Sequence, residues 1–279
     1  MIDVEKKQNF FVKNKTFTIF GILGILIILV AVFAPIVTGG IDPTKGVLTD
    51  ALLPPGGDHI FGTDKLGRDV FARVIYGART SLVAAFCVVI IAFTVGTILG
   101  ILAGYFGKAV DAIIMRLADM MIAFPGMILA IAVAGIMGAS IQNAVIAISL
   151  VTWPKYARLA RSLVLKIRDR DYVAAAIVTG SKTPYMLLRY MLPSAITTLV
   201  ITAATDIGSM MLELAALSFL GFGAVPPTPE WGLMLSEGRP YMTAAPWLMI
   251  FPGIAIFIVV TVFNMLGDSL RDILDPRQE

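Results

Sequence analysis

"SLVAAFCVVIIAFTVGTILGILAG", residues 81–104, contains no charged side chain. As a helix it is long enough to cross the hydrocarbon core of a bilayer, which takes about 20 residues. The run at 141–154 is shorter and reaches a usable length when it is extended to Leu159, through aromatic residues typical of the membrane interface. The sequence therefore predicts an all-α polytopic membrane protein with six spanning helices, built from the apolar runs 17–38, 81–104, 112–137, 141–154, 195–221 and 247–267.

The composition agrees with a membrane protein, because 58% of the 279 residues are hydrophobic and only 15% are charged. The first apolar run follows several lysines, as a secretory signal would, but it is too long for one and no cleavage pattern follows Ala34-Pro35. We therefore expect a spanning helix there. The single cysteine, Cys87, lies inside the second run, so an intramolecular disulfide is excluded.

The lysines and arginines predict the orientation, because positive charge collects on the cytoplasmic side of a membrane protein. With both termini in the cytoplasm, the outer side holds few of the 22 basic residues: Lys45, Lys65, Arg68, Arg73, Arg79 and Arg239. The net charge of +3 then reflects topology and requires no nucleic-acid partner. The expected order is a cytoplasmic N-terminus (1–16), a first span (17–38), an extracellular loop (39–80), a core of five spans (81–267) and a cytoplasmic tail (268–279).

The longest cytoplasmic loop, residues 155–194, ends in "DYVAAAIVTGSKTPYMLLRYMLPS" (171–194). Its apolar residues follow helical spacing in two short segments. Gly180 ends the first segment, and Pro184 is well placed to start the second. The apolar faces of two such helices are too small to insert in a bilayer and too apolar for water. They predict docking on a partner protein.

At these residues the sequence resembles the permease subunits of ABC importers, whose coupling loop reads Glu-Ala-Ala, three residues, Gly, nine residues, Ile, one residue, Leu-Pro. Here the pattern is Ala174-Ala175-Ala176, Gly180, and Tyr190-Met191-Leu192-Pro193. Ala174 replaces the acidic residue, for which Asp171 one turn earlier is a substitute, and Tyr190 replaces the isoleucine. The resemblance implies that a set of residues couples the chain to an ATPase: Asp171, Tyr172, Ala175, Ala176, Gly180, Leu192 and Pro193.

Four longer motifs resemble the second permease of the peptide/nickel importer family: "FGTDKLGRDVFARVIYGARTSL" (61–82), "RLADMMIAFPGMIL" (116–129), "LSFLGFGAVPPTPEWGLML" (217–235) and "FNMLGDSLRDILDP" (263–276). The resemblance implies a multi-pass permease of the cell membrane that forms half of the translocation pathway for nickel, free or chelated, or for peptides. It also implies a heterodimer with a homologous permease, two cytoplasmic ATPase subunits and an extracellular or periplasmic solute-binding protein.

The sequence contains no G-x-x-x-x-G-K-[ST] phosphate loop, since Gly180-Ser-Lys-Thr lacks both the upstream glycine and the Gly-Lys pair. We therefore expect this chain to be no enzyme, to bind no cofactor and to rely on partner subunits for ATP hydrolysis. The single histidine, His59, is interpreted as a surface residue of the extracellular loop, and no metal site or catalytic residue is assigned.

Ionisable residues inside predicted spans are costly in lipid and mark sites that face protein or water. Asp119 follows Arg116 by one helical turn, which predicts a structural ion pair. Asp206 and Glu213 share one face of a helix, with Met210 and Met211 between them, and all four residues are assigned to the translocation pathway. A contact with the partner permease is the alternative for the two acids. Carboxylates suit a metal cation or the ammonium group of a peptide, so the choice between nickel and peptides stays open.

Two other classes of function were considered. An ion-coupled secondary transporter is expected to show repeated halves, broken helices and more intramembrane acids, and we find no such repeat. An intramembrane hydrolase that used Asp206 would need a second carboxylate at the same depth, whereas Glu213 is two turns away. In the extracellular loop, "FARVIYGA" (71–78) has the amphipathic pattern of a helix that lies along the membrane surface.

Overall fold

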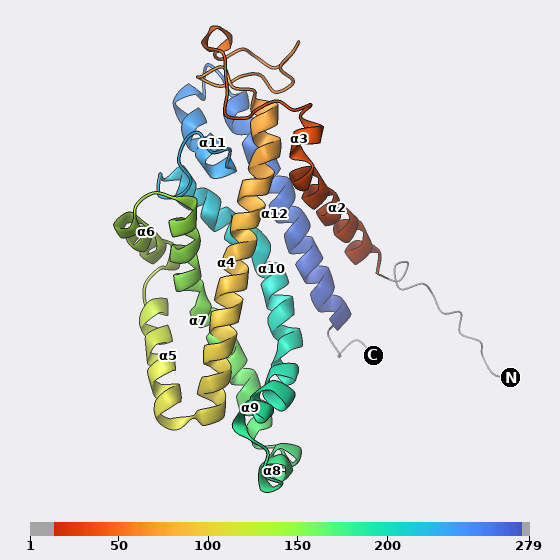
Figure 1. Ribbon diagram of the computed structural model, residues 1–279, viewed down its shortest axis with the longest axis vertical. Coiled ribbons are helices and arrows are strands. Elements are labelled where there is room, and N and C mark those ends of the chain that lie inside the picture. Colours follow the sequence, from red (N-terminus) through yellow and green to blue (C-terminus); the bar gives the residue numbers. More distant parts are fainter. Residues whose placement is uncertain (1–13, 275–279) are drawn as a thin grey trace, which may run out of the picture.

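The computed structural model describes residues 14–274. Four long helices run along the molecule: α4 (Val70–Phe106), α7 (Ile141–Arg168), α10 (Leu192–Phe219) and α12 (Trp247–Leu274) (Figure 1). The all-α prediction is confirmed. Most of the predicted N-terminal segment (1–16) and the end of the predicted tail (268–279) lie outside the described residues.

Shorter helices complete the fold: α2 (Lys15–Val32), α3 (Ala34–Val37), α5 (Lys108–Ile122), α6 (Gly126–Met137), α8 (Asp171–Val178), α9 (Thr183–Met186) and α11 (Trp231–Gly238), with single turns at Leu48–Asp50, Leu187–Met191 and Arg239–Tyr241. Helices α8 and α9 lie at one end of the molecule (Figure 1). The loop that follows α3 and helix α11 lie at the other end. The start of α2 and the end of α12 point toward the α8 end, as the predicted orientation requires.

Four helices of the described chain are long and apolar enough to cross a membrane: α2, α4, the continuous run Thr183–Phe219 and α12. A fifth span results if α5 and α6 are counted together. Helix α7 is long, but Lys155, Arg158 and Arg161 lie in its second half. The count of six spans and the cytoplasmic placement of the termini therefore stay predictions.

Helices α4 and α7 touch along one row of glycines in α4. A Cβ atom added at Gly96 would lie 2.5 Å from the carbonyl oxygen of Trp153, and one at Gly100 would lie 2.3 Å from that of Ala157. A Cβ atom at Gly104 would lie 2.8 Å from the Val164 side chain of α7. Small residues spaced four apart let two helix backbones approach closely, which is a common way to pack helices in a membrane. This contact fixes α7 against the centre of the fold.

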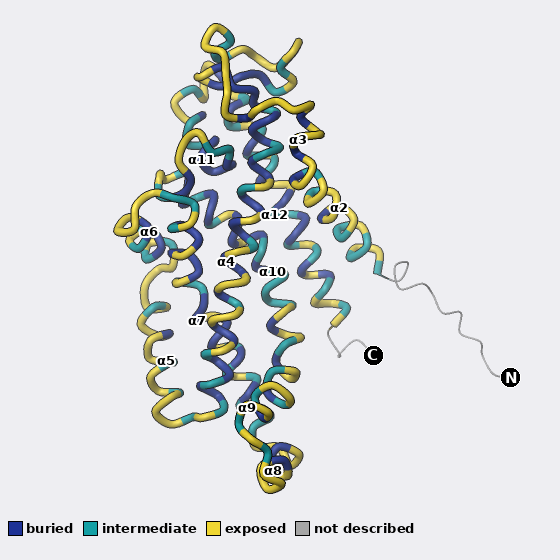
Figure 2. Tube along the Cα trace, viewed as in Figure 1, coloured by how far each residue is buried: buried dark blue, intermediate teal, exposed yellow. Residues whose placement is uncertain are grey.

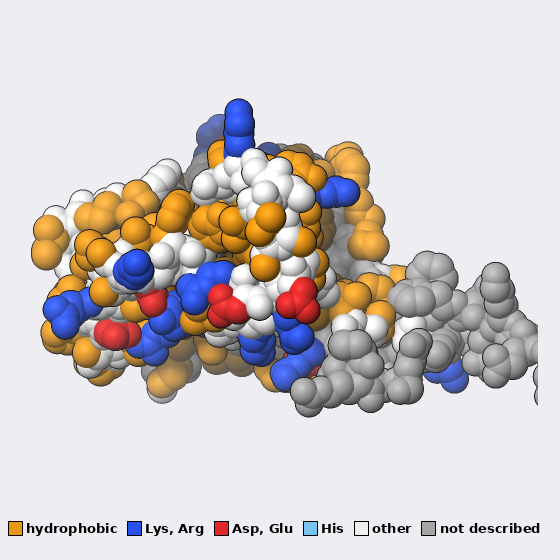
Figure 3. Space-filling view, turned by 90° about the horizontal axis from the view of Figure 1, so that it is seen from below, with side chains coloured by type: hydrophobic (Ala, Val, Ile, Leu, Met, Phe, Trp, Pro, Cys, Tyr) orange, Lys and Arg blue, Asp and Glu red, His pale blue; other side chains and the backbone are white. Residues whose placement is uncertain are grey.

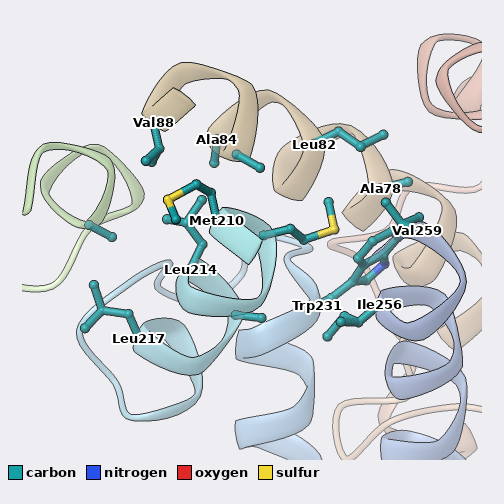
Figure 4. Packing of buried hydrophobic residues seen from close by; sticks show 14 of the residues in the cluster. Ala78, Leu82, Ala84, Val88, Met210, Leu214, Leu217, Trp231, Ile256 and Val259 are labelled. Carbon is teal, nitrogen blue, oxygen red and sulfur yellow. The ribbon is translucent and has the colours of Figure 1, made fainter. Parts of the chain in front are cut away.

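The core continues on the other side of α4. Met210 and Leu214 of α10 pack against the face of α4 that carries Ala84 and Val88 (Figure 4). Near the end of the molecule opposite α8, the indole N–H of Trp231 donates to the carbonyl of Val74 at 2.8 Å. Helices α4, α7 and α10 thus form the buried centre, whereas α2 is largely exposed (Figure 2).

The predicted span at 112–137 is not one straight helix. Helix α5 ends at Ile122 and α6 starts at Gly126, and the two helix axes differ in direction by 93°. Pro125 explains the break, because proline has no N–H for the helix and disfavours helical geometry in the preceding residue. We call the bend at residues 122–127 the elbow.

The predicted surface helix at 71–78 also differs from the structure. These residues are the first turns of α4, which starts where Asp69 caps it by accepting from the backbone N–H of Ala72 at 2.8 Å. Helix α4 therefore begins inside the segment that was predicted to be an extracellular loop.

The predicted coupling segment is helical, with one correction. Helix α8 matches the first predicted helix, and Gly180, with φ of +81°, ends that segment as expected. The second predicted helix is not separate, because Thr183–Phe219 is one continuous helical run that passes through a π turn at Leu187–Met191. The predicted start at Pro184 is confirmed, since this residue lies in the first turn of α9.

Candidate functional site

Asp206 lies in the middle of α10 and is bound by two side chains of α7. The Lys155 ammonium donates to its two carboxylate oxygens at 2.6 and 2.8 Å, and the Tyr156 hydroxyl donates at 2.8 Å. Tyr156 is fully buried and Asp206 is 5% exposed, whereas the Lys155 side chain is 54% exposed. The pair therefore joins α7 to α10 and leaves one side of the lysine open.

Asp206 belongs to a row of polar residues on α10. Spacings of three and four residues place them on one side of the helix. Ser209 is exposed and Glu213 is half-buried, and no hydrogen bond of the Glu213 carboxylate occurs among the described residues. We call this row, together with Lys155, the polar stripe: Lys155, Thr198, Thr202, Asp206, Ser209 and Glu213.

The structure separates the four residues that the sequence assigned to the translocation pathway. Glu213 lies on the accessible part of the polar stripe, and Asp206 is bound inside the chain by Lys155. Met210 and Met211 are 5% and 1% exposed and pack in the core, where Figure 4 shows Met210 between α10 and α4. The methionines therefore turn away from the stripe.

Sequence reasoning missed several members of the polar stripe. The spacing of Thr198, Thr202 and Ser209 around Asp206 was a usable signal, because the three hydroxyls share a helix face with the acid. Lys155 was assigned to the cytoplasmic loop from its position near the end of an apolar run. It lies instead in the middle of α7, and only the packing of α7 on α10 shows its partner.

Helix α8 presents an apolar surface at the end of the molecule. Tyr172, Ile177 and Val178 are 50%, 55% and 87% exposed, and we call them the α8 platform. Val173 and Ala176 of the same helix are buried against the rest of the chain. Seen from this end, lysine and arginine side chains gather around apolar ones (Figure 3).

The structure places the predicted ATPase-coupling residues on both sides of α8 and at the start of α10. Asp171, Tyr172, Ala175, Gly180 and Pro193 are exposed. Ala176 is buried and Leu192 is half-buried, so these two residues hold the segment to the fold rather than present it. The ring of Tyr172 lies 6.0 Å from that of Tyr190, the residue that replaces the family isoleucine.

Ion pairs join α5 to α7. Asp111 pairs with Arg161, and Asp119 pairs with Arg158. The predicted pair between Asp119 and Arg116 is wrong, because the antiparallel packing of α5 on α7 offers Asp119 a guanidinium from another helix. Ala118 is the one buried residue of α5, and Ile114, Met115 and Met121 pack partly buried in the cluster that it forms with Trp153 and Ala157 of α7.

A second ionic cluster lies at the end of the molecule opposite α8 (Figure 1). Glu237 of α11 accepts from Arg68 at 3.1 and 3.2 Å and from Arg73 at 2.8 Å, and Asp64 accepts from Arg68 at 2.6 Å. Both arginine side chains are at most 2% exposed. The cluster fixes the loop to α4 and α11. His59, predicted as a surface residue, is partly buried and contacts Asp69.

Glu230 caps the start of α11. Its carboxylate accepts from the backbone N–H groups of Gly232 and Leu233 at 2.9 and 2.8 Å. Burial raises the pKa of Glu230 above its usual value, and the two backbone N–H groups oppose that shift.

The chain is similar in sequence to known membrane transport proteins. Residues 96–279 match the family model described as "Binding-protein-dependent transport system inner membrane component". The chain is 44% identical over 271 residues to the dipeptide transport system permease protein DppC of Alkalihalophilus pseudofirmus, covering 96% of this chain and 88% of that protein. It is 41% identical over 235 residues to the nickel transport system permease protein NikC of Escherichia coli, covering 84% and 85% of the two chains.

Solved structures agree on the fold. The chain is similar, with a TM-score of 0.58 and 17% identity, to a structure titled "Inward facing conformations of the MetNI methionine ABC transporter", covering 73% of this chain and 97% of that one.

Proposed function

The chain belongs to the family of binding-protein-dependent transport system inner membrane components, and from this premise we propose that it forms half of the translocation pathway of an ATP-driven importer of short peptides. The chain is a multi-pass permease of the inner membrane. The observation that carries the proposed pathway is the polar stripe, because a line of hydroxyl and charged groups on a membrane helix is stable where it faces protein or water.

The charges of the polar stripe favour a peptide. Lys155 and Asp206 neutralise each other, so Glu213 leaves the stripe with one excess negative charge. A peptide presents an ammonium group that Glu213 attracts and a carboxylate that the open side of Lys155 attracts. Imidazole suits a bare nickel ion, and the stripe contains no histidine. Nickel, free or chelated, is therefore the second substrate to test.

The α8 platform is the proposed contact with a cytoplasmic ATPase. Its three apolar side chains are exposed on a short helix, which suits a groove on another protein. Because the sequence has no phosphate loop, ATP is hydrolysed by two such partner subunits in this proposal. A homologous permease supplies the other half of the pathway, and a solute-binding protein delivers the substrate to the extracellular end.

Uptake by the whole reconstituted transporter tests the proposal. We expect ATP-dependent accumulation of a labelled dipeptide, and no accumulation of labelled nickel either free or chelated. Nickel uptake without dipeptide uptake would contradict the proposed substrate. Substrate flux through this chain without an ATPase would favour a secondary transporter instead.

Charge removal tests the pathway itself. Glu213→Gln keeps the size of the side chain but deletes its attraction for an ammonium group, so dipeptide uptake should fall while assembly of the complex persists. Asp272→Asn is the matched control, because it removes an exposed carboxylate at the end of α12, outside the polar stripe. Wild-type uptake by the Glu213 variant would remove that residue from the pathway, and loss of assembly would make it a subunit contact.

A further inference from the structure

One turn of the helical run Thr183–Phe219 differs from the rest in its hydrogen bonds. At Leu187–Met191 the helix is a π turn, and the backbone N–H of Leu192 donates to the carbonyl of Leu187, five residues back instead of the usual four. The π turn lies between α9 and α10. It therefore separates the segment that carries the α8 platform from the helix that carries most of the polar stripe.

Pro193 explains why the helix widens at this point. In a regular α-helix the N–H of residue 193 would donate to the carbonyl of Arg189, but proline has no N–H and its ring clashes with the carbonyl four residues back. A wider turn moves that carbonyl away from the ring. The Ser194 hydroxyl donates to the carbonyl of Met191 at 2.7 Å, so a side chain replaces part of the interrupted backbone pattern.

Two buried methionines depend on the extra residue of the π turn. Met186 and Met191 are both 0% exposed and belong to one cluster with Val173 of α8. Residues five apart on a regular α-helix point about 140° away from each other. The wider turn brings the two side chains closer to one side of the helix, where both are buried. A change to an α turn would therefore alter how this segment packs.

Tyr190 connects the π turn to the coupling segment. Its ring lies 6.0 Å from that of Tyr172 on the α8 platform and 6.0 Å from that of Tyr185 in α9. Aromatic rings at this separation form stabilising pairs. A displacement of α8 therefore reaches the π turn through contacts between side chains as well as through the backbone.

The two sides of the π turn are held very differently. Beyond it, Ala195 and Leu199 of α10 are 0% exposed and pack in the same cluster as Tyr156 of α7, and Asp206 is bound by Lys155. Before it, six of the eight residues of α8 are exposed. The π turn thus joins a fixed helix to an exposed segment.

We propose that the π turn is the hinge of the coupling segment, so that residues 171–186 move as a unit relative to α10, and that Pro193 keeps this hinge from stiffening into an α turn. The reason is that helices bend where proline or a π turn interrupts the regular backbone hydrogen bonds. This inference rests on the proposed function, in which an ATPase subunit moves the α8 platform. Without the hinge, α8 could follow that subunit only by pulling α10 out of its packing on α7.

Distances between spin labels in the whole transporter test the hinge. The natural Cys87 is replaced by alanine, and labels are attached at Lys182→Cys and at Ile113→Cys, which is 63% exposed on α5. Lys182 is seven residues before Arg189 in the middle of the π turn, about 10 Å along a helix, so a bend of about 20° displaces it by about 4 Å. We expect a shift of this size between the nucleotide-free transporter and the transporter with the analogue AMP-PNP.

A second label pair and two proline variants provide the controls. Val200 is 42% exposed on α10 beyond the π turn, and its distance from Ile113 should stay constant. Pro193→Ala restores an N–H donor for the carbonyl of Arg189, so it should lose most of the shift at Lys182, and dipeptide uptake should fall with it. Pro184→Ala is the matched control, because this exposed proline lies in the first turn of α9 and should leave the shift unchanged.

Three results would overturn the hinge: no shift at Lys182, an equal shift at Val200, or a full shift in the Pro193 variant. Dipeptide uptake by the same preparation separates the two levels of inference. ATP-dependent uptake without a shift at Lys182 refutes the hinge alone, whereas the expected shift without ATP-dependent dipeptide uptake refutes the proposed function alone.

Discussion

Replacing Gly100 by alanine should destabilise the protein through the contact between α4 and α7. The new Cβ atom would lie 2.3 Å from the carbonyl oxygen of Ala157 and 2.7 Å from the Cβ of Ala160. Ordinary contacts require roughly 1 Å more, and a backbone carbonyl cannot rotate away, so the two helices have to separate. Overpacking of this kind costs ~3 kcal/mol at the upper end of its usual range.

A second contribution opposes this cost, because alanine is favoured over glycine in a helix by about 1 kcal/mol. The expected net loss is therefore about 2 kcal/mol in the free energy of unfolding. For a chain of this size that corresponds to a decrease in Tm of about 4 to 8 °C. Thermal unfolding of the purified complex, followed by fluorescence, measures it.

Gly253→Ala is the matched control. Gly253 also lies inside a long helix, α12, but an added Cβ would meet no atom within 4 Å. We expect its Tm to stay unchanged or to rise slightly, since only the helix preference acts. Equal Tm values for the two variants would show that α4 and α7 are not in backbone contact at Gly100, and would refute the close packing described above.

Three further outcomes are expected. Gly180→Leu places a side chain at φ of +81°, a conformation that costs an L-residue about 1 to 2 kcal/mol, so the α8 platform should shift. ATP hydrolysis should then continue while substrate uptake falls. Normal uptake by this variant would contradict docking through this segment. Glu237→Gln leaves two buried arginines short of a carboxylate and should destabilise the complex by ~3 kcal/mol in thermal unfolding, whereas an unchanged Tm would show that Asp64 suffices. Because burial raises the pKa of Glu230, the folded state binds this proton more tightly than the unfolded state. The contribution of Glu230 to stability is therefore fully present below the usual pKa of about 4.3 and is lost as pH rises through the raised value, so the difference in stability between the wild type and Glu230→Gln should change over that range.

Much of the fold follows from the sequence because the bilayer accepts few solutions. Long uncharged runs such as 81–104 can only be helices in lipid, and they predict the all-α class without knowledge of the neighbours. Local signals were equally reliable in the coupling segment, where Gly180 and Pro184 mark the end of α8 and the start of α9. The motifs of the coupling loop and of residues 61–82 also indicated the family, which the comparisons confirm.

The sequence could not show which residues meet across helices. Asp119 was assigned to Arg116, its neighbour along the chain, but it pairs with Arg158 because α5 packs on α7. Lys155 and Asp206 are 51 positions apart, and hydropathy does not relate them. Helix periodicity places a side chain on a face, but it does not say whether that face meets protein, lipid or water.

The tertiary structure therefore decided the two sites of functional interest. It turned Met210 into the core and left Ser209 and Glu213 accessible, because packing of α10 on α4 determines which side of the helix is covered. It also bent the predicted span at 112–137 by 93° at the elbow, which lies against Val151 of α7. The sequence by itself determined that these segments are apolar helices of a permease. Only the contacts between helices determined which of their faces remain open, because the same apolar residues serve equally well against lipid, a neighbouring helix or a second subunit.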